Sequence, residues 1–155
     1  MKNFDVNQRG GTLCLSKAGL AEGTNANTIK TAAPNGAGTD YMIGGKLYHK
    51  ADTDNIAMTA CAAQADLTSC LYLVSIDASG NVKITKGTEV LTANIGVGKY
   101  SLAWPKCPAN ECPIGGVRID LSGGTFTSGT TDLSGTGVTD TWYDFGLVPN
   151  EVLVA

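Results

Sequence analysis

The chain has 155 residues, of which 43% are apolar and 16% are charged, and its formal net charge at pH 7 is −3. A chain of this length is expected to form one domain and to bury roughly 68–70% of its unfolded surface, enough for a sizeable core. The acidic balance argues against nucleic acid as the principal partner, because phosphate binding needs a basic surface. No apolar run reaches the roughly 18 residues that a membrane span needs, so no membrane partner is expected.

The N-terminal region, residues 1–40, differs from the rest because short apolar groups alternate with glycines and nothing recurs at helical period. This pattern predicts an extended arm with one or two short strands, ahead of a β-rich body over residues 41–155. Ordering such an arm costs chain entropy, so we expect a partner to hold it, although a frayed terminus is an equally open interpretation. Four apolar and three basic side chains are predicted to make this contact: Phe4, Val6, Leu13, Leu15, Arg9, Lys17 and Lys30.

The clearest structural pattern lies in residues 71–86, LYLVSIDASGNVKITK. Its first half is apolar and rich in β-branched residues, and its second half alternates apolar and polar side chains. Residues 77–81 between them predict a hairpin loop built around a type I turn, with Gly80 at positive φ. Ahead of this hairpin, residues 41–50 predict a strand, a Gly-Gly bend and a second strand. Residues 51–65 fit a helix by alanine content or a strand by alternation, and the neighbouring strands favour a strand.

The second half of the chain also predicts strands and loops. Residues 88–100 predict a strand with a bend, and the three prolines of residues 101–113 exclude a central strand and indicate an ordered loop anchored by Trp104. Residues 122–141 are mostly Gly, Ser and Thr and predict an exposed strand or long loop, while the aromatic stretch 142–149 is expected to close the sheet. The spacing of the predicted strands and turns predicts an all-β fold, with a body that is an antiparallel β-sandwich or a barrel-like sheet.

No catalytic or metal-binding set accompanies these strands. His49 is the single histidine, so a Ser-His-Asp or Cys-His arrangement has to use it, and a two-His metal site is impossible. A lone histidine on a predicted strand is mostly a surface or packing residue. We therefore expect neither an enzyme nor a cofactor.

Five cysteines are the most suggestive group of side chains. Cys107 and Cys112 flank a loop short enough for a disulfide, and Cys61 and Cys70 flank a turn. In a protein made in the cytoplasm, reduced thiols are the default. Three alternatives are therefore open for these four cysteines: a disulfide within one or both pairs, a zinc site, or free thiols. Cys14 is expected to be free in each case.

Four motifs occur in a characteristic order: LYHKA at 47–51, CLYLV at 70–74, DASGNV at 77–82 and CPIGGVRI at 112–119. Together, over roughly residues 45–120, they resemble small virion proteins of tailed bacteriophages, of the head-decoration or head-fibre-like type. The resemblance implies an antiparallel β-rich body, often trimeric, with an N-terminal segment that fastens it to the capsid or a neighbouring subunit. It implies no catalytic activity, and no functional residue transfers individually.

The expected function is that of a structural virion component, a capsid decoration protein that binds the phage head through its N-terminal arm and subunit interfaces. The expected partners are the major capsid protein and copies of the chain itself in a homotrimer. The expected location is the capsid surface after synthesis in the host cytoplasm, because no secretory apolar stretch follows Met1. Two alternatives are a tail-fibre or receptor-binding module that recognises carbohydrate through Trp104, Trp142 and Tyr143, and an extracellular filament or adhesin subunit.

Overall fold

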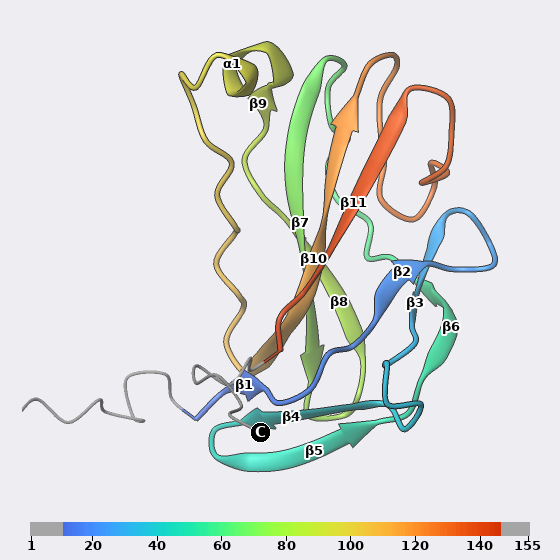
Figure 1. Cartoon of the computed structure of the whole chain (residues 1–155), viewed down its shortest axis with the longest axis vertical. Coiled ribbons are helices and arrows are strands. Elements are labelled where there is room, and N and C mark those ends of the chain that lie inside the picture. Colours follow the sequence, from blue (N-terminus) through green and yellow to red (C-terminus); the bar gives the residue numbers. More distant parts are fainter. Residues whose placement is uncertain (1–10, 147–155) are drawn as a thin grey trace, which may run out of the picture.

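A central antiparallel sheet runs the length of the molecule in the computed structural model, which describes residues 11–146 (Figure 1). Its strands are β7 (Thr68–Asp77), β8 (Val82–Lys86), β9 (Val90–Leu91), β10 (Glu111–Leu121) and β11 (Val138–Asp144). They follow the order β11-β10-β7-β8, and β9 also pairs with β7. β7 is buried over nearly its whole length because it lies inside the sheet and both of its faces are covered.

The predicted hairpin over residues 71–86 is confirmed as β7 and β8, which pair from Tyr72↔Lys86 to Ile76↔Val82. Gly80 has φ +82°. Asp77 holds the turn, since its Oδ1 accepts hydrogen bonds from the backbone N–H groups of Ser79 at 2.8 Å and Asn81 at 3.0 Å. This side-chain-to-backbone bonding is the reason Asp is favoured at the start of such turns.

Two smaller antiparallel sheets pack beside the central one. The first is β1-β4-β5, made of β1 (Leu13–Cys14), β4 (Thr39–Ile43) and β5 (Lys46–Lys50). The second is β2-β3-β6, made of β2 (Leu20–Glu22), β3 (Thr28–Thr31) and β6 (Thr53–Ala57). The sheet β1-β4-β5 crosses one end of the molecule (Figure 1). The predicted all-β, antiparallel, sandwich-like fold is confirmed, and within residues 11–146 no sheet closes into a barrel.

The N-terminal region does not extend away from the body over its described part. β1, β2 and β3 pair with other strands, and Ala18 and Ile29 are fully buried in the core cluster with Cys14 and Leu20. The close approach at Gly19, where an added Cβ would lie 2.0 Å from the Ala32 carbonyl oxygen, fits this packing. The chain entropy of this Gly-rich region is therefore offset by burial against its own body.

Two segments differ from the predicted strands. In residues 51–65, only β6 forms a strand, and the alanine-rich part after it has no regular structure. In residues 88–100, β9 is only two residues long and leads into the short helix α1 (Thr92–Gly96), which buries none of its residues. No helix in the described range is long and apolar enough to cross a membrane.

The proline-rich segment is an extended loop up to residue 110, as predicted, but Pro113 lies inside β10. A register irregularity between Pro113 and Gly115 explains how the strand accepts a residue that has no N–H group. The loop over residues 122–137 is polar, as predicted, yet Phe126 and Leu133 within it are fully buried. β11, with Trp142 and Tyr143, completes one edge of the central sheet.

Candidate functional site

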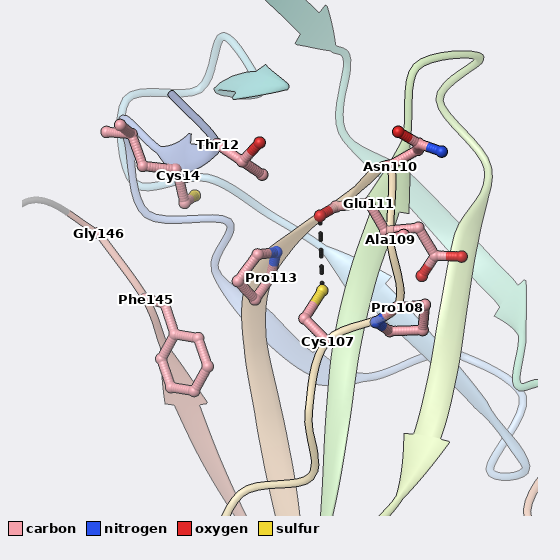
Figure 2. Close-up of a pocket in the computed structure, with 11 residues that line it drawn as sticks. Thr12, Cys14, Cys107, Pro108, Ala109, Asn110, Glu111, Pro113, Phe145 and Gly146 are labelled. Carbon is pink, nitrogen blue, oxygen red and sulfur yellow. Dashed lines mark hydrogen bonds between the residues drawn. The ribbon is translucent and has the colours of Figure 1, made fainter. Parts of the chain in front are cut away.

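The first groove lies between β1 and the loop that precedes β10, and Figure 2 shows its lining. Its volume is about 520 Å3. It is lined by Thr12, Leu13, Cys14, Cys107, Pro108, Ala109, Asn110, Glu111, Pro113, Phe145 and Gly146. Burial raises the pKa of Cys14 and Cys107 to about 11, so both thiols stay protonated at neutral pH. Because the thiolate is the reactive form, neither of these two thiols is an activated nucleophile at neutral pH.

Glu111 is a buried carboxylate at the start of β10 with a structural role. Ser75 Oγ donates to its Oε2 at 2.5 Å, and Lys83 Nζ donates to its Oε1 at 2.9 Å. The carboxylate raises the pKa of Lys83, first through this hydrogen bond. Both carboxylate oxygens are occupied, so Glu111 ties β10 to β7 and β8.

His49 lies on the exposed strand β5, where its Nδ1 is 2.8 Å from Asp40 Oδ1 on β4. The two residues are register partners in the sheet, and both side chains are about half exposed. No serine or cysteine among the described residues is hydrogen-bonded to this imidazole. The pair therefore resembles a cross-strand surface contact more than a catalytic dyad.

The five cysteines are free thiols, so the two bridges considered from the sequence are not formed. Cys112 and Cys70 are fully buried in the core cluster, whereas the partner of each lies in an irregular, partly exposed segment. The Cys107 Sγ donates to the Glu111 carbonyl oxygen at 3.5 Å, and the Cys61 Sγ donates to the Thr59 carbonyl oxygen at 3.5 Å. Within residues 11–146 no group of three or more His, Cys, Asp or Glu side chains is placed to hold a metal ion.

A second groove, the aromatic groove, lies beside β10 and β11 of the central sheet and has a volume of about 620 Å3. It is lined by Lys17, Leu71, Leu102, Trp104, Arg118, Trp142, Tyr143, Asp144 and Phe145. Gly116 and Tyr143 are register partners, so they face the same side of the sheet. Trp104, from the loop after α1, lies over Gly116, where an added Cβ would come within 2.4 Å of the indole ring.

Three aromatic rings meet in this groove. The Trp104 ring centroid is 5.6 Å from that of Tyr143 and 5.0 Å from that of Phe145, both in edge-to-face geometry. Trp104 and Tyr143 remain 37% and 39% exposed. Trp142 borders the groove, but it is the register partner of Val117 and packs against the core. Of the three aromatic residues singled out from the sequence, two therefore share one surface and the third supports the core.

The helix α1 and β9 lie at the end of the molecule opposite the sheet β1-β4-β5 (Figure 1). Four exposed apolar side chains lie in or next to these two elements and are called the apolar tip. It consists of Leu67, Leu91, Val97 and Tyr100, which are 60%, 53%, 77% and 54% exposed. Leu67 and Leu91 adjoin each other, because the Thr92 N–H donates to the Leu67 carbonyl oxygen at 3.0 Å. Tyr100 shares a shallow hollow with Leu91. The sequence analysis missed this surface, since single apolar residues in short loops carry no periodic signal.

The seven side chains predicted to contact a partner do not form one surface within the described residues. Leu13 lines the first groove, Lys17 lines the aromatic groove, and Lys30 lies on β3. Leu15 is partly buried, and its backbone N–H donates to the Asp40 carbonyl oxygen. Phe4, Val6 and Arg9 lie outside the described residues.

In comparisons with protein-family models, with curated proteins and with solved structures, nothing matches this chain. The fold class therefore rests on the chain's own structure. The function has to be argued from its surfaces and from the resemblance of its motifs.

Proposed function

We propose that this chain is a structural virion component, a capsid decoration protein that works as a trimer on the head of a tailed phage. The observation that carries the proposal is the apolar tip, whose four large apolar side chains are each more than half exposed and lie on β9 and on the segments that flank β9 and α1. Large apolar side chains exposed together at one end of a protein are typical of a contact with another protein. The motif resemblance over residues 45–120, which spans β5 to β10, supports a phage virion protein as the kind of assembly.

The apolar tip is proposed as the contact between copies of the chain. A closed ring of three copies repeats one head-to-tail contact three times, so each tip side chain that is covered contributes once in every subunit. The remaining partner, the major capsid protein, is expected to be bound by the N-terminal segment.

Replacing two tip residues, Leu91→Ser with Val97→Ser, is expected to turn the trimer into a monomer. Covering the exposed parts of these side chains stabilises the contact by about 2 kcal/mol, which corresponds to roughly thirtyfold in affinity. Mass measured by light scattering after gel filtration checks this. The matched control is Leu47→Ser, since Leu47 is 67% exposed on β5 at the other end of the molecule and should leave the trimer intact. A trimeric double variant, or a wild-type chain that is monomeric at every concentration, contradicts the proposed contact.

Deleting residues 1–10 is expected to abolish capsid binding while the trimer and the thermal unfolding temperature are preserved. The deletion stops short of β1 because residues 13–31 contribute three strands and buried side chains to the body. A longer deletion would unfold the protein and test nothing about the capsid. The measurement is co-sedimentation with purified phage heads that lack the protein.

Full occupancy of the heads by the truncated protein would show that the N-terminal segment is not the capsid contact. Detection of the chain in purified virions by mass spectrometry, at a copy number comparable with that of the capsid protein, supports the virion assignment. Its absence from virions of the phage that encodes it contradicts that assignment.

A further inference from the structure

The aromatic groove combines a rigid aromatic centre with charged side chains at its edge. We propose that this groove is a saccharide-binding site that takes uncharged hexose units of a glycan chain. This inference does not depend on the virion assignment, since it rests on the groove alone. Its volume of about 620 Å3 lies within the range of natural ligand sites, roughly 300–1,000 Å3.

The aromatic centre is held in place before any ligand binds. Trp104 lies over the backbone of Gly116 and is flanked edge-to-face by Tyr143 and Phe145. A ring whose orientation is already fixed loses little freedom on binding, which favours affinity. A hexose ring presents C–H groups on its faces, and the electron-rich face of an aromatic ring attracts such weakly positive hydrogens.

The polar side chains offer both acceptors and donors. The Leu20 N–H donates to Asp144 Oδ1 at 3.1 Å, which fixes the carboxylate and leaves Oδ2 without a partner among the described residues. Arg118 Nε donates to Asp120 Oδ1 at 2.8 Å, and no described residue accepts from its two terminal nitrogens. Lys17 is exposed and makes no ion pair in the described part of the chain.

This mixture selects among ligand classes. A purely apolar ligand would cover the Lys17 ammonium group, the terminal nitrogens of Arg118 and the Asp144 Oδ2 without giving them a hydrogen-bond partner, which costs free energy. A charged ligand of either sign meets at least one side chain of its own sign, because Lys17 and Arg118 are basic and Asp144 is acidic. Sugar hydroxyls both donate and accept, so an uncharged saccharide satisfies the whole set.

The test uses the full-length protein on an array of glucose, galactose and mannose oligosaccharides, with sialylated and uronic-acid glycans as a second arm. The wild type is expected to bind at least one uncharged oligosaccharide, and Trp104→Ala is expected to weaken that binding by at least about tenfold. Leu47→Ala is the control, because Leu47 is an exposed apolar residue outside both the aromatic groove and the apolar tip, and its loss should leave binding unchanged.

A second readout guards against a variant that fails to fold. Tyr143→Ala removes a half-exposed ring from the edge strand and is expected to weaken binding as well, and thermal unfolding identifies any variant that has lost its structure. Titration of the wild type with the bound oligosaccharide should also change the Trp fluorescence. The proposal is overturned if the wild type binds no uncharged oligosaccharide, if it binds acidic glycans only, or if binding survives both substitutions in folded protein. Capsid occupancy is measured separately, so failure here leaves the proposed function standing.

Discussion

Replacing Gln64 with leucine is expected to lower the free energy of unfolding by about 3 kcal/mol, because it breaks a buried hydrogen-bond network. Gln64 is fully buried, and its Nε2 donates to the carbonyl oxygens of Thr68 at 3.0 Å and Ile119 at 3.1 Å. Its Oε1 accepts from the Tyr72 hydroxyl at 3.1 Å. One side chain thus joins β7, β10 and the irregular segment that follows β6. Chemical denaturation of the variant and the wild type measures the loss.

Tyr72→Phe provides the control for this network, since it removes only the hydroxyl group that donates to Gln64 Oε1. Alone it is expected to cost about 1 kcal/mol, and in its background Gln64→Leu should cost less than in the wild type. If Gln64→Leu changes stability by less than about 0.5 kcal/mol, the size of an ordinary surface substitution, the network does not hold the core together.

Phe126→Ala is expected to destabilise the protein by about 3–5 kcal/mol, the usual cost of truncating a fully buried aromatic residue. The Phe126 ring is 0% exposed and packs edge-to-face on Tyr72, with 5.6 Å between the ring centroids. Its backbone also pairs with that of Gln64, so the ring and the network share one part of the core. Thermal or denaturant unfolding measures the effect.

The neighbouring Thr125→Ala supplies the matched comparison, because Thr125 is exposed in the same loop. It is expected to stay within about 0.5 kcal/mol of the wild type. Equal effects of the two substitutions would mean that the loop over residues 122–137 contributes no core residue and lies on the surface, as its composition suggests.

The hairpin β7–β8 shows what could be predicted of the fold. Its apolar run, its alternating partner and its Asp-to-Gly turn are all local patterns, and the structure confirms each of them. The segment after β6 shows where such patterns fail. Its alanines fit a helix or a strand by period, and neither forms. The segment instead ends at Gln64, whose backbone pairs with that of Phe126 and whose side chain donates to the Ile119 carbonyl oxygen.

The N-terminal region was misread for a related reason. Its glycines indicate close backbone contacts as readily as they indicate flexibility, and the sequence does not say what approaches them. In the structure, the partner that orders residues 13–31 is the body of the same chain. The contact proposed for this region therefore falls on residues 1–10.

The candidate surfaces were predictable only in part. Trp104 and Tyr143 stood out as aromatic residues, but nothing in their spacing indicated that their rings meet while Trp142 packs against the core. That grouping follows from the register of β10 with β11, which turns Tyr143 to the side of Gly116 and Trp142 to the side of Val117. The apolar tip likewise appears only once the turn at Leu67 and the helix α1 are brought together.

The sequence by itself determined the fold class, the central hairpin and the proline-rich loop, because alternation, turn chemistry and proline geometry act between neighbouring residues. Only the tertiary structure decided which polar residues are buried, as Gln64 is, which glycines are approached closely by another segment, as Gly116 is by Trp104, and which apolar residues remain exposed. These outcomes depend on segments that are far apart in the chain and meet across a sheet. No pattern among neighbouring residues reports the free energy of those contacts.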